Sequence, residues 1–148
     1  MGTVPWGLET RDGLVVVRSP VLDRIPGLAH AFSTRCADGR DDFDLGEAGP
    51  VDPSILDRRL RFARAAGLGD RRPAVLRQVH GERIVLACET DRGGVLEADG
   101  VVSRRGDRPE PVPAVRTADC VPVLLAHVGG EVVAAVHAGW RGVAAGAV

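Results

Sequence analysis

Two apolar runs on either side of a glycine pair constrain the fold of this chain more than any other feature. The runs extend from Val121 to His127 and from Glu131 to His137, and Gly129-Gly130 lies between them. A glycine pair between two such runs is a strong signal of an antiparallel hairpin with a tight turn. With the two glycines as the turn, His137 faces Pro122 across the hairpin.

This register places a thiol beside an imidazole. Cys120 lies two residues from Pro122, so it shares a face with His137 in the diagonal position, at roughly 7 to 8 Å between backbones. A four-residue loop would place Cys120 directly opposite His137, whereas a three-residue loop would put the two on opposite faces. Two of the three registers therefore allow both side chains to bind one metal ion.

A second histidine completes a candidate metal site. His80 ends the apolar run 74–79 and is followed by Gly81, a pattern typical of a strand end that enters a turn. Two imidazoles and one thiol are ligands that zinc prefers, and three protein ligands leave the fourth tetrahedral position open, as in catalytic zinc sites. Nothing local brings His80 to the hairpin, and a lone histidine or buried cysteine is more often structural.

The remaining pattern predicts short strands and one helix. Asp52-Pro53 is typical of an N-cap followed by the first helical residue, and Gly67 or Gly69 ends this helix. We expect loops over residues 36–49 and 103–113, where turn residues are frequent. We expect strands over residues 13–18, 28–33, 74–79, 83–87, 100–103 and 112–116, in addition to the hairpin. The second half of the chain is therefore dominated by β-sheet.

The composition argues against several classes of protein. The chain has 148 residues, of which 45% are hydrophobic and 26% charged, which is ordinary for one soluble domain. Its 19 basic residues are all arginine and stand against 20 acidic residues, so no global field draws it to nucleic acid or to an anionic membrane. Three cysteines without a secretion signal argue against a disulfide framework. We therefore expect reduced thiols, a cytoplasmic location, and neither nucleic-acid nor membrane partners.

Two further features could bind an anion. The segment from Ala138 to Gly142 predicts a turn that opens a helix, and N–H groups at a helix N-terminus suit phosphate. Arg35 follows Phe32-Ser33-Thr34 at the expected end of a strand and could supply a forked cation for the same anion. In the alternative interpretation, the glycines allow close packing and Arg35 forms a surface salt bridge with the acidic loop that follows.

Five short motifs occur along the chain in a specific order and spacing. They are Phe32-Ser33-Thr34-Arg35, Gln78-Val79-His80-Gly81, Glu97-Ala98-Asp99-Gly100, Thr117-Ala118-Asp119-Cys120-Val121-Pro122 and His137-Ala138-Gly139-Trp140-Arg141-Gly142. The set strongly resembles the bacterial laccase-domain family, from Phe32 to the last residue. Members of this family are variously named polyphenol oxidase, purine nucleoside phosphorylase or peptidoglycan editing factor.

The resemblance implies a fold, a metal and an activity. The fold is α/β (α+β), a layered arrangement of mixed β-sheets flanked by helices. The metal is a zinc ion bound by His80, Cys120 and His137. The activity is phosphorolysis of adenosine, inosine, guanosine and methylthioadenosine, with adenosine deamination as a second activity. The partners that the resemblance implies are therefore a purine nucleoside and phosphate.

The resemblance also suggests roles for residues around the zinc. Cys120 and His137 would act at the catalytic centre, where zinc polarises the substrate or activates water. Arg35 would act with them as a catalytic residue by holding phosphate or the ribose side of the substrate. Asp119 or Gln78 would position the metal ligands without binding the metal themselves.

The chain departs from the family pattern in two places. The usual Gly-Gly-Val-Ser turn is replaced by Cys36-Ala37-Asp38-Gly39, which is followed by an Asp-rich segment. The chain also ends soon after His137, whereas family members continue with a further helix, more strands and additional pocket residues. We therefore expect a single laccase-like domain over residues 1–148 that is incomplete at its C-terminus. Uncovered sheet edges would favour self-association or a complementary C-terminal fragment.

The residues leave alternatives open for the metal and for the function. The chain has four histidines, no His-x-His pair and Met1 as its single methionine, so zinc fits better than the copper clusters of laccases. A metal-free hydrolase would instead use Cys120 as the nucleophile and His137 as its base. The substrate could also be a cell-wall precursor. The remaining alternative is an inactive zinc-binding fragment.

Overall fold

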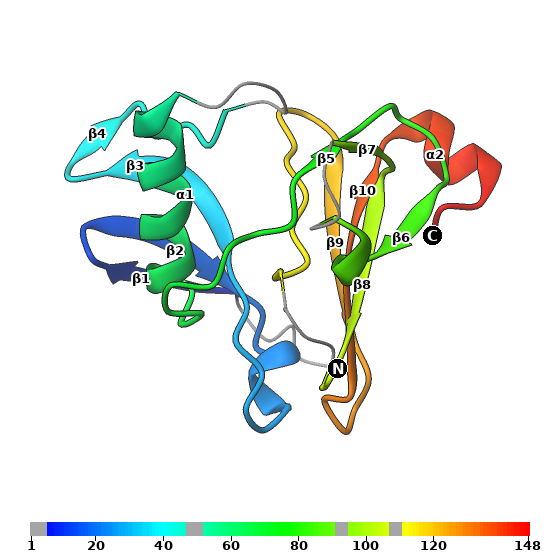
Figure 1. Cartoon of the computed structure of the whole chain (residues 1–148). Helices are drawn as coiled ribbons and strands as arrows, with labels where there is room; N and C mark the ends of the chain where they lie inside the picture. The colour runs from blue at the N-terminus through cyan, green and yellow to red at the C-terminus, as the bar shows by residue number, and fades with distance from the viewer. Residues whose placement is uncertain (1–5, 47–51, 91–94, 107–110) are drawn as a thin grey trace. The chain divides into compact units, whose positions relative to one another are not determined.

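The described residues form two compact units, each of which combines strands with helices (Figure 1). The computed structural model describes residues 6–46, 52–90, 95–106 and 111–148. Unit 1 runs up to Gly46 and resumes over Asp52–Arg71, and unit 2 contains the described residues from Arg72 to Val148. Residues 47–49 and 107–110 of the two expected loops lie outside the described residues. None of the described helices is long and apolar enough to span a membrane.

Unit 1 is built on an antiparallel sheet with the strand order β1-β2-β3-β4. Its elements are β1 (Gly7–Arg11), β2 (Leu14–Arg18), the 3-10 helix η1 (Leu22–Arg24), β3 (Phe32–Ala37), β4 (Arg40–Asp41) and α1 (Pro53–Ala65). Its buried apolar cluster consists of Leu14, Val16, Ala37, Phe43 and Ala65. The cluster combines residues of the sheet with the end of α1, so burial of apolar surface holds helix and sheet together.

Two Asp-Gly pairs explain where this sheet differs from the expected strands. Asp12-Gly13 and Asp38-Gly39 have positive φ at both residues, the conformation of tight hairpin turns, and they join β1 to β2 and β3 to β4. β1 was not expected because its side chains are mostly exposed and lack an apolar alternation. The strand expected over 28–33 begins instead at Phe32. It continues through Cys36, which was wrongly expected in a loop.

Helix α1 begins where the sequence predicts. The Asp52 side chain accepts a hydrogen bond from the backbone N–H of Ser54 at 2.7 Å, and Pro53 occupies the first helical position. The helix ends at Ala65, and Gly67 follows with a φ of 82°, in the left-handed region that favours glycine. The prediction of this helix is confirmed.

Unit 2 is built on a mixed four-stranded sheet with the order β6-β8-β10-β9. β6 and β8 are parallel, whereas β8 with β10 and β10 with β9 are antiparallel. Its elements are β5 (Leu76–Arg77), β6 (Ile84–Leu86), the 3-10 helix η2 (Ala87–Glu89), β7 (Leu96–Glu97), β8 (Gly100–Arg104), β9 (Val121–Ala126), β10 (Val132–Ala138) and α2 (Trp140–Ala145). β5 pairs with β7 in parallel. Strands, helices and mixed pairing confirm the α+β class with mixed sheets.

The core of unit 2 lies beside the turn that carries His80. Its buried cluster consists of Ala74, Leu76, Val85, Ala87, Ala98 and Val101. These residues come from β5, β6, β8 and the segments next to them, which are the elements that flank the turn after β5. The turn is therefore anchored at both ends in packed structure.

The strand expected over 112–116 is absent. Val112 forms an isolated parallel bridge with Pro73, and the backbone of Arg116 bonds to the side chain of Gln78. The two prolines that flank Val112 have no N–H to donate, so a regular ladder cannot extend through them.

The β9–β10 hairpin has the register predicted from the glycine pair. His137 pairs with Pro122 and Ala138 with Val121 (Figure 1, in orange). The backbone N–H of His127 donates to the carbonyl of Val132 at 2.8 Å, so residues 128–131 form the connection. The connection extends by one residue on each side of the glycine pair, so the register does not shift and Cys120 stays diagonal to His137 rather than directly opposite it.

Candidate metal centre

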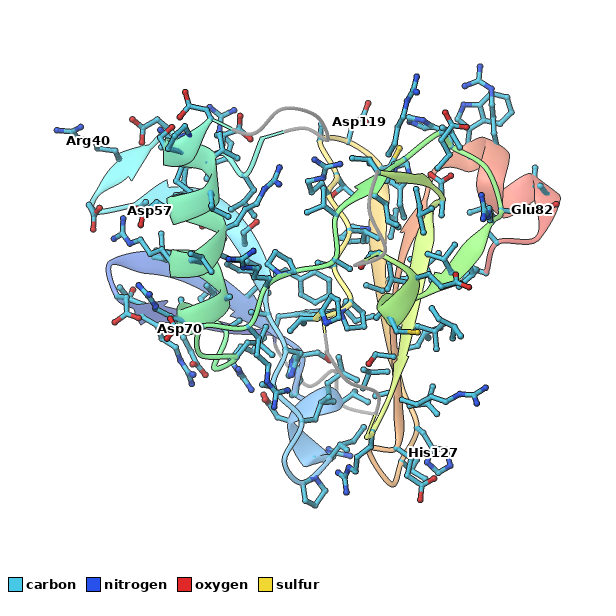
Figure 2. The ribbon with its side chains drawn as sticks, viewed as in Figure 1. Arg40, Asp57, Asp70, Glu82, Asp119 and His127 are labelled. Atoms are coloured by element: carbon cyan, nitrogen blue, oxygen red, sulfur yellow. The ribbon has the colours of Figure 1, made fainter. Side chains whose placement is uncertain are left out.

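Three side chains from separate parts of unit 2 converge at one end of its sheet. His80 lies in the turn after β5, Cys120 immediately before β9, and His137 in β10. One potential ligand atom from each residue lies within 4.8 Å of the others. The two imidazole rings have centroids 4.8 Å apart and planes at 81°. Figure 2 marks this end of the sheet by the labelled Asp119, the residue before Cys120.

The spacing of these atoms suits a small metal ion. Zinc-to-donor distances of about 2.0 to 2.3 Å place tetrahedral ligand atoms roughly 3.3 to 3.6 Å apart. Because no two of the three ligand atoms are more than 4.8 Å apart, they need to approach one another by no more than about 1.5 Å, which side-chain rotations can supply. His137 is buried, Cys120 is half-buried and His80 is exposed, so the site opens towards solvent on the side of His80. An open side leaves room for a fourth ligand.

Gly139 borders all three candidate ligands. A Cβ built at Gly139 would lie 3.1 Å from Cδ2 of His80 and 3.5 Å from both Sγ of Cys120 and Cε1 of His137. The φ of Gly139 is −71°, so its backbone does not require glycine. The absence of a side chain at position 139 therefore leaves room beside the three ligands and is not required by the backbone conformation of the turn.

Asp99 contacts two of the three candidate ligands. Its Oδ1 lies 2.8 Å from Nδ1 of His137 and accepts a hydrogen bond from the backbone N–H of His80 at 2.9 Å. Its Oδ2 accepts from the N–H groups of Gly81 at 2.7 Å and Val79 at 3.3 Å. The side chain is completely buried. The motif Glu97-Ala98-Asp99-Gly100 contains this residue but does not reveal its role, and the only sequence signal for it is an acidic residue directly before the apolar run that starts at Gly100.

The environment of Asp99 favours its charged form. Burial alone raises the pKa of the Asp99 carboxyl, but the hydrogen bonds from His137 and from the N–H groups of Gly81, His80 and Val79 together lower it further than burial raises it. The net result is a pKa below the ordinary value for aspartate. Asp99 is therefore a carboxylate at neutral pH.

His80 has an unusual backbone conformation. Its φ is 61°, in the left-handed region, which costs a residue with a side chain about 1 to 2 kcal/mol. The N–H groups of His80 and of both its neighbours point at the Asp99 carboxylate, and these bonds offset that cost. On the other side of the turn, a Cβ at Gly142 would lie 2.4 Å from the Gly81 carbonyl oxygen. The turn is therefore held between Asp99 and α2.

The Cys120 thiol is protonated at neutral pH in the absence of metal. Burial raises the pKa of this thiol, and the charge and hydrogen bond of Asp119 raise it further. An activated nucleophilic cysteine needs the opposite shift, because the thiolate is the reactive form. Coordination to a metal cation removes the proton from a thiol. The surroundings of Cys120 therefore suit a metal ligand better than a metal-free nucleophile.

Gln78 and Asp119 lie close to the candidate ligands in different ways. The Gln78 amide donates to the carbonyl of Arg116 at 2.7 Å and accepts from its N–H at 2.9 Å, which ties the segment before Cys120 to the segment before His80. Asp119 is the sequence neighbour of Cys120 and acts on its thiol. Their role in orienting the metal ligands stays a prediction.

Arg35 lies in unit 1, on β3, whereas the three candidate ligands lie in unit 2. Its Nη2 donates to the carbonyl of Asp41 at 3.2 Å, and its Nε lies 3.6 Å from Oδ1 of the same residue. The Arg35 side chain is 77% exposed. The surface salt bridge considered as its alternative role is thus present, and its role in binding phosphate stays a prediction.

The turn after His137 opens a helix, as the sequence predicts, but the helix is short. α2 covers only Trp140–Ala145, and the Arg141 guanidinium lies 4.5 Å above the exposed Trp140 ring. A helix of six residues has few aligned peptide dipoles, so it contributes little to binding an anion. The glycines at 139 and 142 serve close packing, which was the alternative interpretation of this segment.

Comparisons with known proteins agree with the resemblance inferred from the motifs. Residues 30–148 match the family described as multi-copper polyphenol oxidoreductase laccase. A purine nucleoside phosphorylase of Mycobacterium tuberculosis is 39% identical over 109 residues, which are 73% of this chain and 42% of that protein. A purine nucleoside phosphorylase of Deinococcus radiodurans is 34% identical over 137 residues, which are 90% of this chain and 50% of that protein.

One solved structure extends the similarity to the fold. The crystal structure of a Neisseria meningitidis protein assigned to DUF152 matches with a TM-score of 0.59 and 29% identity. The match covers 93% of this chain and 50% of that protein. The chain thus spans about half the length of the relatives that it matches.

Proposed function

The chain belongs to the family described as multi-copper polyphenol oxidoreductase laccase, and on this premise we propose that it carries the metal centre of a zinc-dependent purine nucleoside phosphorylase. The observation that carries the proposal is the convergence of two imidazoles and one thiol within 4.8 Å, beside a glycine that leaves the space between them free. The names of the relatives in Mycobacterium tuberculosis and Deinococcus radiodurans supply the activity.

The donor set supports zinc over copper. His80, Cys120 and His137 match a catalytic zinc site with three protein ligands and one open position. Multicopper centres need more histidines than the four in this chain, and the single methionine, Met1, lies outside the described residues. Bound zinc supplies a Lewis acid that polarises a substrate oxygen or lowers the pKa of water.

The reaction that we propose is attack of a phosphate oxygen on C1′ of the ribose. The bond from C1′ to the purine nitrogen breaks, its electron pair leaves with the base, and the base takes up a proton. The substrates are adenosine, inosine, guanosine and methylthioadenosine, and adenosine deamination is a second activity of the same centre. Arg35 contributes a cation for the phosphate, since a guanidinium binds two phosphate oxygens at once.

We also propose a cytoplasmic location and a single domain over residues 1–148.

A second candidate is a metal-free hydrolase that acts on another substrate, such as a cell-wall precursor. The contact of His137 with a buried carboxylate favours it, because Cys120, His137 and Asp99 together have the composition of a nucleophile, a base and an orienting acid. The raised pKa of the Cys120 thiol argues against it. The third candidate, an inactive zinc-binding fragment, shares the metal but not the reaction.

Metal analysis and phosphorolysis assays test the proposal on the 148-residue chain. We expect about one zinc per chain, inosine cleavage that depends on phosphate, and loss of both in Cys120→Ala. Arg35→Gln is expected to raise KM for phosphate and keep the zinc, whereas Arg40→Gln, a control on the next strand, changes neither. A wild-type chain without zinc contradicts the metal assignment. Zinc without phosphorolysis supports the inactive fragment.

A further inference from the structure

We propose that Asp99 is the positioning residue of this metal centre: one buried carboxylate orients His137 through its ring and His80 through its backbone. The proposal deepens the proposed function and rests on it for the presence of a metal. The Asp99 side chain is completely buried, and its four contacts are with His137 and the His80 turn, so it acts on the metal through the two histidines.

Four donors surround the Asp99 carboxylate, and a carboxylate is the side-chain group that accepts from all of them. Three are the consecutive N–H groups of Val79, His80 and Gly81, and the fourth is Nδ1 of His137. Two donors face each oxygen, which matches the lone pairs that a carboxylate offers. An asparagine at the same position would turn its NH₂ group towards two of the four donors.

The contact with His137 determines which ring nitrogen can bind a metal. The Asp99 carboxylate has no hydrogen to donate, so Nδ1 of His137 carries the proton. The other nitrogen, Nε2, then carries the lone pair. The side chains of His137 and Asp99 are 4% and 0% exposed, so water cannot replace this contact. His137 is thereby prepared as a ligand before any metal arrives.

The contact with the turn determines where the second histidine lies. The left-handed φ of His80 redirects the chain after β5, and three N–H bonds to one carboxylate hold that conformation. Consecutive N–H groups that converge on one anion form a compact binding concavity. Gly142 packs against the carbonyl of Gly81 and closes the turn from the other side.

The backbone of Asp99 has its own hydrogen bonds, so the role of its side chain can be tested separately. The N–H of Asp99 donates to the carbonyl of Arg83 at 2.9 Å, and its carbonyl accepts from the N–H of His137 at 2.7 Å. Both bonds survive a change of side chain. Asp99→Asn has nearly the same volume, so it replaces one of the two acceptor oxygens with an NH₂ donor without creating a cavity.

The first test measures the tautomer of His137 in the metal-free protein. At about pH 8, above the ordinary histidine pKa, we expect the ¹⁵N shifts of His137 in the wild type to show a proton on Nδ1 and a free Nε2. Asp99→Asn is expected to shift His137 towards the other tautomer. A wild-type His137 protonated on Nε2 overturns the proposal, whether or not the variant folds.

The second test measures zinc affinity by competition with a chromophoric chelator. We expect Asp99→Asn to bind zinc about 10- to 100-fold more weakly than the wild type, the usual effect of losing a residue that orients a ligand. Glu82→Gln removes an exposed carboxylate two residues after His80 (Figure 2) and is expected to change affinity by less than about fivefold. Equal losses in the two variants, or unchanged affinity in Asp99→Asn, contradict the proposal.

The two tests separate this proposal from the proposed function. Zinc binding without phosphorolysis removes the proposed activity and leaves the role of Asp99 intact. A wild-type chain that binds no zinc removes the metal centre, and the tautomer of His137 still decides whether Asp99 orients that ring.

Discussion

At the scale of single residues, the candidate metal centre depends on a position with no side chain. Gly139 has an ordinary backbone conformation, so replacement by alanine strains nothing locally. The added methyl group would press on the His80 ring at 3.1 Å from Cδ2 and would contact Sγ of Cys120 and Cε1 of His137 at 3.5 Å.

We therefore expect Gly139→Ala to weaken zinc binding by about tenfold or more, while the free energy of unfolding changes by less than about 1 kcal/mol. Chelator competition and urea denaturation measure the two effects. Gly7→Ala is the matched control, because a Cβ there meets its nearest atoms at 4.0 Å and lies in unit 1. Unchanged zinc affinity in Gly139→Ala would show that the metal does not bind between these ligands.

The Cys120 thiol gives a prediction about pH. Its pKa is raised by burial and by Asp119, so the reactive thiolate forms at a higher pH than the thiolate of an ordinary cysteine does. Without metal, we expect alkylation of Cys120 by iodoacetamide to be slow at neutral pH and to accelerate as the pH rises through this raised pKa. Added zinc is expected to block the reaction. Mass spectrometry of the Cys120 peptide measures the rate, and fast alkylation at neutral pH, unaffected by zinc, supports the hydrolase instead.

At the scale of elements, α2 packs against the His80 turn through a glycine. Alanine favours a helix over glycine by about 1 kcal/mol, so propensity alone predicts that Gly142→Ala stabilises the protein. A Cβ at 2.4 Å from the Gly81 carbonyl oxygen requires the helix or the turn to move. Overpacking of this kind costs typically 1 to 3 kcal/mol, which exceeds the gain in propensity.

We therefore expect Gly142→Ala to lower the free energy of unfolding by roughly 1 kcal/mol and to weaken zinc binding as the turn shifts. Chemical denaturation and zinc titration test both effects. Ala144→Gly in the same helix is exposed, so it is expected to lower stability by propensity alone and to leave zinc affinity unchanged. A stabilised Gly142→Ala would show that α2 does not press on the turn.

The elements differ in how far the sequence could predict them. Helix α1 carries its own start signal in Asp52-Pro53, and the β9–β10 hairpin carries its turn in the glycine pair. The strand β1 was missed because it is an edge strand with no apolar alternation. The Asp-Gly pair that turns it into β2 was a usable signal.

At the scale of the whole molecule, metal binding should be linked to folding. A ligand that binds only the folded state stabilises it by about 2.7 kcal/mol at a concentration of 100 times its Kd. We expect zinc to raise the unfolding temperature of the wild-type chain and to slow hydrogen exchange in unit 2 around the His80 turn and the β9–β10 hairpin. Cys120→Ala is the control, and an equal shift in that variant would show that zinc acts elsewhere.

The sequence by itself determined one part of this centre, the pair formed by Cys120 and His137 at the hairpin. The alternation of side chains along a strand and the glycine pair in the turn decide which residues share a face, and this placed Cys120 beside His137. The residue types made His80 a candidate ligand, and the family resemblance supplied the mixed-sheet fold and joined His80 to the pair. Neither the pattern nor the resemblance gave a physical reason for His80 to reach the hairpin.

The tertiary structure decided how the second histidine joins the pair. His80 lies 57 residues before His137 in the sequence, and the link between them is Asp99, which directly precedes β8, one of the two inner strands of the sheet. No periodicity encodes such a contact, because it arises from the pairing order of β6, β8 and β10 and from packing against α2. Local patterns fix the face and register of a strand, whereas the meeting of distant segments depends on how the whole unit packs.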